Sequence, residues 1–386
     1  MKICIAQINS TVGALSDNAS LIIKAANEAS EEKATILVTP ELSLTGYPPE
    51  DLLLDIDFLN QTKEQLLSLA KICPNIYIIV GHPLLEEEKI FNAASILYKG
   101  KIYRTYKKQI LPNYGVFDEK RYFDIGHSNL IFNHKNKKIG LLICEDIWNE
   151  KPIKKLLKNS VDYIICINAS PYEIEKQNHR IKTIQKKIKG AGIKFVYVNA
   201  VGGQDDLLFD GGSFILDSNN GLISELPQFK IINKIIDTEV PAKKILSNNL
   251  TNTQILLDGL VLSLKDYLHK NSIKKVFLGL SGGIDSALVL YLASKACNKK
   301  NIHAIMMPSK FTSKISLEDA KKLTDNLGIK YTIKRIDTLM NKINQMLNID
   351  FNGQPIDITE ENIQSRIRGL LLMAYANKFK GVVLTT

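Results

Sequence analysis

The sequence predicts an α/β protein of two domains, a layered first part with hairpins and a second part built on a doubly wound parallel sheet. Three observations support this. A chain of 386 residues is too long for one ordinary domain. Short apolar runs typical of strands recur between helical patterns. Around residue 280, two adjacent glycines separate an apolar strand from an apolar helix, as at the ligand-binding turn of a parallel α/β sheet.

The first part combines strands, helices and hairpins. Helical patterns cover 18–30 and 57–71, and strand-like runs lie at 3–8, 35–38, 76–80, 139–143, 163–167 and 195–198. Residues 94–98 with 101–106, and 213–217 with 222–225, are paired runs separated by short turns and predict hairpins. Hairpins beside helical connections favour a mixed sheet or a pair of sheets.

The second part begins after a polar stretch. Residues 237–253 carry Pro241 and a cluster of Asn, Thr and Ser, so we place a first domain at 1–240, a linker at 241–256 and a second domain at 257–386. Residues 254–269 have an amphipathic helical pattern. Strand-like runs then alternate with helices and predict a parallel, doubly wound sheet, with strands at 276–280, 302–306, 330–336 and 381–384.

Composition indicates a soluble globular protein, with 45% hydrophobic and 23% charged residues. The net charge is +10, but the basic residues form no block long enough for a nucleic-acid-binding arm. Five scattered cysteines without a CxxC pair argue against a disulfide framework or a zinc site and for a reducing cytoplasm. The N-terminal run reads as a strand rather than a signal peptide, and no apolar run is long enough to span a membrane.

The glycine-containing loop Ser281-Gly-Gly-Ile-Asp-Ser286 is the most informative motif. Adjacent glycines let backbone N–H groups converge, and the helix that follows adds its own N–H groups and the positive end of its dipole. This is a cradle for an anion such as a phosphate. No Lys follows the glycines, so it is not the GxxxxGK[ST] loop. An ordinary turn is the competing interpretation, and Asp285 could either cap the helix or reach Mg²⁺.

Three polar residues follow strand-like runs of the first domain: Glu41, Lys108 and Cys144. Sites in α/β sheets are assembled at such strand ends. A carboxylate can accept the proton of a thiol, and an ammonium can stabilise an oxyanion, so the set suits acyl transfer. The residues alone leave a simpler interpretation open, because a cysteine at a strand end is commonly a small buried hydrophobic residue.

The loop resembles that of the ATP-pyrophosphatase family, and residues 276–386 resemble NAD synthetases, through 279–287, 307–309, 360–369 and 384–386. The resemblance implies an ATP site and assigns Asn362 to deamido-NAD⁺ and Asp285 to Mg²⁺. The implied ATP-contacting residues are Gly279, Leu280, Ser281, Gly282, Gly283, Ile284, Asp285, Ser286, Met307, Arg366 and Thr386. Core packing remains open for Met307, and a solvated helix face for Arg366.

The first domain resembles the nitrilase superfamily, and within it the glutaminase domain of glutamine-dependent NAD synthetases. The matching segments are 40–42, 45–52, 111–121, 144–148, 168–171, 199–205 and 210–213. The resemblance implies an αββα sandwich with Glu41 as general base, Lys108 as oxyanion partner and Cys144 as nucleophile. It places glutamine at Tyr114, Ser170 and Lys176. Glu119 is either a supporting carboxylate or a surface residue.

Both resemblances together imply a ligase that hydrolyses glutamine and passes the ammonia internally to a second site. There ATP and Mg²⁺ activate the carboxylate of deamido-NAD⁺, and ammonia converts it to NAD⁺ with release of AMP and pyrophosphate. The implied partners are these small molecules and further copies of the same chain in a homo-oligomer, with no nucleic acid or membrane.

The chain stops at Thr386, where the family continues with Gly-Asn-Lys-Ser-Glu. We therefore expect either a piece of a longer gene product or a truncated synthetase domain, and in the second case glutamine hydrolysis without NAD⁺ formation. Other interpretations remain open: a stand-alone glutaminase or an amidase for small amides, another ATP-pyrophosphatase such as a nucleotide amidotransferase or a tRNA-modifying enzyme, and a non-enzymatic scaffold.

Overall fold

The computed structural model describes residues 1–240 and 251–386. The chain forms two compact units, residues 1–259 and 260–386, which are described separately. The first unit holds two six-stranded sheets. One sheet has the order β14-β1-β2-β3-β4-β5, formed by Ile232–Asp237, Lys2–Gln7, Ile36–Val38, Tyr77–Glu86, Lys89–Tyr98 and Lys101–Lys107. The other has the order β13-β12-β9-β8-β7-β6, formed by Gly221–Glu225, Phe214–Asp217, Lys194–Asn199, Tyr163–Asn168, Lys137–Ile143 and Leu130–His134.

Both sheets are mixed, as the sequence predicts. Strands β1, β2 and β3 are parallel, whereas β14 and the β3-β4-β5 meander pair antiparallel. In the other sheet β7, β8 and β9 are parallel, and β6, β12 and β13 pair antiparallel. The two predicted hairpins are confirmed as β4-β5 and β12-β13. A further small pair, β10 (Val201–Gln204) and β11 (Leu207–Asp210), lies outside the two large sheets.

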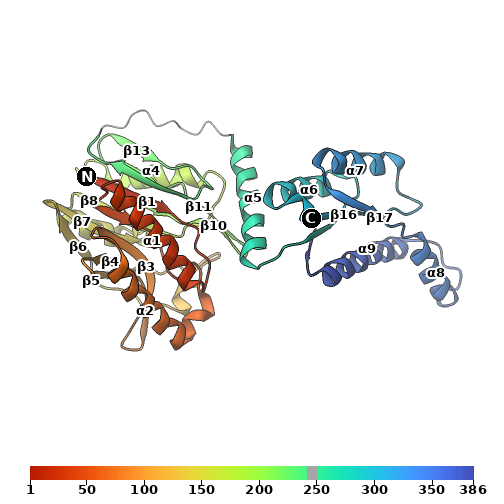
Figure 1. The fold of residues 1–386 in the computed structure, drawn as a ribbon, viewed down its shortest axis with the longest axis horizontal. Helices are drawn as coiled ribbons and strands as arrows, with labels where there is room; N and C mark the ends of the chain where they lie inside the picture. Colours follow the sequence, from red (N-terminus) through yellow and green to blue (C-terminus); the bar gives the residue numbers. More distant parts are fainter. Residues whose placement is uncertain (241–250) are drawn as a thin grey trace. The chain divides into compact units, whose positions relative to one another are not determined.

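Strand β1 shows how alternation builds the layers. Ile3 and Ile5 point into the core between the two sheets, while Cys4 and Ala6 point to the opposite face. That outer face packs against helices α1 (Leu15–Glu31) and α2 (Ile56–Ile72) (Figure 1). Successive side chains of a strand face opposite sides, so one short segment serves two apolar layers.

The second sheet is covered in the same way by α3 (Glu150–Lys158) and α4 (Lys176–Ile188). Gly140 of β7 admits Leu156 of α3 so closely that a Cβ there would lie 2.8 Å from the leucine side chain. The first unit is therefore an αββα sandwich, which confirms the predicted fold class.

The second unit is a four-stranded parallel sheet in the order β17-β16-β15-β18. The strands are Lys330–Ile333, Ile302–Met306, Val276–Gly279 and Val382–Leu384. One face packs on α6 (Ile284–Ala296) and α7 (Lys314–Leu327), and the other on α8 (Asp337–Phe351) and α9 (Ile358–Phe379) (Figure 1). The chain reverses its direction of travel between β15 and β18, so the doubly wound topology is confirmed and its switch point lies there.

The division into domains and linker stays a prediction. Residues 241–250 of the predicted linker lie outside the described residues, and its residues 252–256 form the start of helix α5 (Asn252–Lys270). Gly259 in α5 packs closely against Phe229 and Leu208 of the first unit. Among the described helices, none is long and apolar enough to cross a membrane.

Candidate active site

The three strand-end residues of the first unit are all buried. Glu41 follows β2 and is 2% exposed, Lys108 follows β5 and is 0% exposed, and Cys144 follows β7 and is 4% exposed. Lys108 Nζ donates to Glu41 Oε1 at 2.7 Å. The fold therefore brings the predicted base and the predicted cation into direct contact, although 67 residues separate them in sequence.

Glu41 is held through both carboxylate oxygens. Besides Lys108, its Oε1 accepts a hydrogen bond from Asn92 Nδ2 of β4 at 2.8 Å. Its Oε2 accepts from the backbone N–H of Ala169, just past β8, at 2.9 Å. Contacts from three different segments fix the orientation of this carboxylate, which a general base requires.

Lys108 is held by a second buried carboxylate, Glu119. Nζ lies 2.8 Å from both Glu119 oxygens, and Tyr47 donates to Glu119 Oε1 at 2.9 Å. Burial raises the pKa of Glu119 to about 7, against the opposing effect of Lys108. For Lys108, burial favours the neutral amine, but Glu119 and Glu41 outweigh it and raise its pKa well above the ordinary value, so the ammonium stays charged.

Cys144 opens a short 3₁₀ turn (Cys144–Ile147) with φ at 42°, a left-handed conformation that costs a residue with a Cβ about 1–2 kcal/mol. Burial raises the pKa of its thiol well above 9.0, Glu41 raises it further, and Lys108 lowers it. The thiol is therefore protonated at neutral pH, and it becomes a nucleophile only when a neighbouring base takes the proton.

Asp146 joins the Cys144 turn to the segment after Lys108. Its Oδ1 accepts from the backbone N–H groups of Gln109 and Ile110 at 3.0 and 2.9 Å. Its Oδ2 accepts from Tyr106 at 2.7 Å and from the N–H of Ile143 at 3.1 Å. The two strand ends that carry the cation and the thiol are thus bound to one buried carboxylate.

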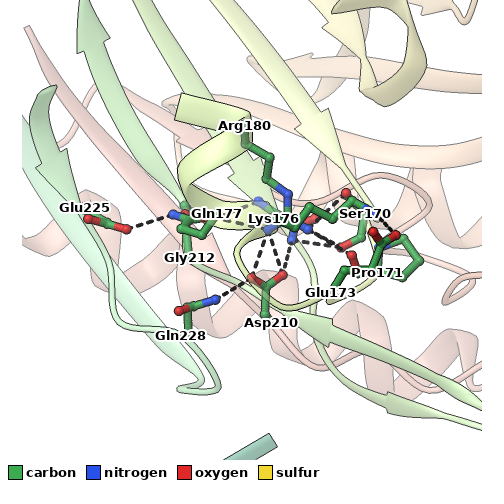
Figure 2. A network of polar contacts seen from close by, with 12 residues as sticks. Ser170, Pro171, Glu173, Lys176, Gln177, Arg180, Asp210, Gly212, Glu225 and Gln228 are labelled. Atoms are coloured by element: carbon green, nitrogen blue, oxygen red, sulfur yellow. Dashed lines mark hydrogen bonds and ion pairs between the residues drawn. The ribbon is translucent and has the colours of Figure 1, made fainter. Parts of the chain in front are cut away.

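A cavity of about 810 Å³ opens at Cys144. The three residues that the sequence assigns to glutamine, Tyr114, Ser170 and Lys176, all line it. Tyr114 donates to Glu145 Oε2 at 3.0 Å, and Lys176 at the start of α4 contacts Glu173 at 2.6 Å (Figure 2). The cavity is therefore lined by a thiol, hydroxyl groups, carboxylates and the lysines Lys176 and Lys182. A larger cavity of about 1140 Å³ elsewhere in this unit contains none of the predicted site residues.

The glycine loop of the second unit joins β15 to α6. Gly282 has φ at +87°, and a Cβ there would lie 2.2 Å from the carbonyl oxygen of Ser316, so only glycine fits. The hydroxyl groups of Ser281 and Ser286 lie 3.1 Å apart, and Ser281 Oγ accepts from the N–H of Gly283 at 3.2 Å. Gly283 is the N-cap of α6, so the orphan N–H groups of the helix face the loop.

The remaining residues predicted for this site occupy four places. Asp285 lies in the first turn of α6 and is exposed. Met307 follows β16 and belongs to the apolar cluster between the sheet and α9, as the packing interpretation expects. Asn362 and Arg366 are exposed on α9, where the guanidinium of Arg366 donates to the Asn362 carbonyl at 3.3 Å. Thr386 follows β18, which pairs with β15, so it leaves the sheet at the same end as the loop.

Several residues of the first site escape sequence reasoning. Asn92 lies in the middle of β4, Asp146 in the short turn Cys144–Ile147, and Arg180 in helix α4. Nothing in the neighbouring sequence distinguishes them from ordinary strand, turn and helix residues. Glu119 is buried and contacts Lys108, which favours the supporting carboxylate over a surface residue. Its sequence signal is its place in the matching segment 111–121.

Two family models match the chain: carbon-nitrogen hydrolase over residues 2–244 and NAD synthase over residues 256–386. Among curated proteins, the glutamine-dependent NAD(+) synthetase of Acinetobacter baylyi is 39% identical over 390 residues, covering 100% of this chain and 72% of the relative. That of a Synechocystis species is 41% identical over 408 residues, covering 100% of this chain and 73% of the relative.

Solved structures agree. The glutamine-dependent NAD⁺ synthetase of Acinetobacter baumannii in complex with ADP has a TM-score of 0.95 at 39% identity, covering 100% of this chain and 74% of that chain. An amidase from Nesterenkonia sp. AN1 shares the fold of the first unit, with a TM-score of 0.55 at 23% identity, covering 61% of this chain and 92% of that chain. With two matching family models and relatives aligned along its whole length, the chain belongs to the glutamine-dependent NAD(+) synthetase family.

Proposed function

We propose that this chain hydrolyses glutamine at Cys144 and that the ammonia serves to amidate ATP-activated deamido-NAD⁺, giving NAD⁺, AMP, pyrophosphate and glutamate. The observation that carries the glutaminase role is the buried Glu41–Lys108 pair, 2.7 Å apart, beside a thiol that lines a polar cavity. A scaffold would need no such cluster, since burying charged groups is costly.

In the first step the Cys144 sulfur attacks the carbon of the side-chain amide of glutamine while Glu41 takes the thiol proton. The Lys108 ammonium stabilises the negative oxygen that forms on that carbon. The C–N bond then breaks, the proton on Glu41 goes to the departing nitrogen, and ammonia leaves a glutamyl thioester on Cys144. In the second step Glu41 takes a proton from water while the water oxygen attacks the thioester carbon. The C–S bond then breaks, the proton on Glu41 goes to the departing sulfur, and glutamate leaves with the Cys144 thiol and the Glu41 carboxylate restored.

In the second unit we assign the 279–286 loop to the ATP phosphates, because converging N–H groups and a helix N-terminus suit an anion. Asn362 and Arg366 share one face of α9 and are assigned to deamido-NAD⁺ and phosphate. Asp285 offers an exposed carboxylate next to the loop, which suits Mg²⁺, an ion that commonly binds one or two carboxylates together with nucleotide phosphates. Bound there, Mg²⁺ would neutralise phosphate charge.

The test compares ammonia release from glutamine by the wild-type chain, Cys144→Ala and Cys166→Ala. Cys166 is a second buried free thiol, on the neighbouring strand β8, and serves as the matched control. We expect Cys144→Ala to release no ammonia and Cys166→Ala to remain active. Ammonia release by Cys144→Ala at the wild-type rate would refute the role of this thiol.

From family membership we further propose a homo-oligomer in the cytoplasm. Sedimentation velocity of the purified chain would check the assembly, and a single monomeric species at micromolar concentration would contradict it.

A further inference from the structure

Arg180 in α4 is the largest of the fully buried side chains in the described residues, and its contacts join the walls of the glutamine cavity. Its Nη1 lies 2.9 Å from both Asp210 oxygens, and Asp210 at the end of β11 is also 0% exposed. Its Nη2 donates to Ser170 O at 2.9 Å, Ser170 Oγ at 3.0 Å and Pro171 O at 3.1 Å (Figure 2). One guanidinium therefore binds an acid with one nitrogen and the cavity wall with the other.

The cavity wall that Arg180 holds is a short irregular segment. Ser170 follows the last pair of the β8–β9 ladder, Asn168 with Asn199, and just beyond it an isolated bridge joins Pro171 to Phe209 of β11. Asn199 supplies two more contacts, accepting from Ser170 N at 2.9 Å and donating to Ser170 O at 3.2 Å. Arg180 reaches both the side-chain oxygen of Ser170 and the next carbonyl, that of Pro171.

Arg180 also fixes the other wall. Lys176 is four residues earlier on α4 and therefore lies on the same face of the helix. Ser170 and Lys176 both line the cavity at Cys144. Arg180 therefore links the Ser170 segment directly to the helix that begins at Lys176.

A purely stabilising role explains this arrangement poorly. A buried ion pair is often no more stabilising than well-packed apolar residues, because both charges lose their hydration. A lysine would satisfy Asp210, but only the planar guanidinium presents donors in two directions at once. The two sets of guanidinium donors are therefore needed to hold Ser170 and Asp210 at the same time.

We propose that Arg180 is a positioning residue that sets the affinity for glutamine by holding Ser170 and Lys176 at a fixed separation across the cavity. The inference rests on the proposed glutaminase function. Loss of the Nη2 contacts to Ser170 and Pro171 should therefore weaken substrate binding more than it slows the chemistry at Cys144. Glu41 would keep its contact with Ala169, which precedes the residues that Arg180 holds.

The test uses Arg180→Lys, which keeps a cation beside Asp210 but cannot span to Ser170 and Pro171. Steady-state glutamine hydrolysis gives KM and kcat, and alkylation of Cys144 by iodoacetamide, followed by mass spectrometry, reports the reactivity of the thiol without the glutamine-binding groups. Gln228→Met is the matched control, since Gln228 donates to the same Asp210 at 2.7 Å. Arg180→Met combined with Asp210→Asn gives a second variant without an unpaired buried charge.

We expect both Arg180 variants to raise KM about 10- to 100-fold, the range for losing hydrogen bonds from a charged donor. The kcat should fall less, alkylation should proceed at the wild-type rate, and Gln228→Met should keep the wild-type KM. An unchanged KM would overturn the inference, as would a parallel fall in kcat, alkylation rate and melting temperature, which marks a purely structural role. If the wild-type chain itself hydrolyses no glutamine, the proposed function fails instead.

Discussion

Glu119 holds the ammonium of Lys108 with both of its carboxylate oxygens, each 2.8 Å from Nζ. Lys108 contacts two buried carboxylates, because its Nζ also lies 2.7 Å from Glu41. Glu119 thus helps to keep the ammonium charged and oriented beside Glu41, the proposed general base. This relationship leads to three predictions for the first unit.

Glu119→Gln should lower kcat for glutamine hydrolysis by about 10- to 100-fold, since a charge-assisted contact contributes roughly 1.5–3 kcal/mol. The amide keeps the size of the side chain but no longer orients the ammonium by charge. Steady-state kinetics at saturating glutamine would measure it. Glu145→Gln, which changes a carboxylate of the same cavity, is the comparison and should affect KM more than kcat. Equal kcat values for wild type and Glu119→Gln would show that Glu119 does not contribute to glutamine hydrolysis.

The pH dependence of stability should also change in Glu119→Gln. Burial raises the pKa of Glu119 from 4.5 to about 7. Between these values the unfolded chain releases a proton that the native chain keeps, so this group makes stability fall as pH rises from 4.5 to 7. Asp146, whose pKa burial raises to about 6, acts in the same direction but is present in both proteins. Urea unfolding should therefore show a flatter pH profile for Glu119→Gln, and identical profiles would contradict the raised pKa.

Lys108→Met should be strongly destabilising, because it leaves Glu41 and Glu119 buried without their shared cation. Removing one partner of a buried pair costs about 3–5 kcal/mol. Adding Glu119→Gln removes one of the stranded charges and should restore part of the loss. Fluorescence of Trp148, the single tryptophan of the chain, follows urea unfolding of the first unit. A double variant as unstable as Lys108→Met would show that the two carboxylates are not the source of the cost.

Gly282→Ala should abolish nucleotide binding by the second unit. A Cβ there meets the Ser316 carbonyl at 2.2 Å and the φ of +87° disfavours any side chain, so the loop must open. Gly328→Ala is the matched control, since Gly328 has φ at +66° with nothing within 4 Å. It should lose about 1 kcal/mol of stability from strain alone. Calorimetric titration with ATP separates the two, and ATP binding by Gly282→Ala as tight as that of Gly328→Ala would contradict the assignment.

The sequence allowed prediction of those site residues that lie in a recognisable local pattern. Glu41, Lys108 and Cys144 each follow a strand that the sequence marks, and the glycine loop joins a clear strand to a clear helix. That the ends of strands from two different sheets come together could not be predicted from these patterns. Strand β14 could not be predicted in this way. Ile232–Asp237 is half-exposed, its apolar residues are interrupted by Asn233 and Lys234, and its partner β1 is distant in sequence. Asn92 and Arg180 escaped for the same reason, since their partners are distant in sequence and only the fold brings them together.

Trapping the glutamyl thioester tests the central claim most directly. The chain is mixed with glutamine, quenched in acid within the first turnovers and digested, and the peptide that holds Cys144 is examined by mass spectrometry. We expect a glutamyl adduct on Cys144 that decays at neutral pH and that is absent from Cys144→Ala. Steady release of ammonia from glutamine with no adduct on Cys144, and undiminished release by Cys144→Ala, would contradict it.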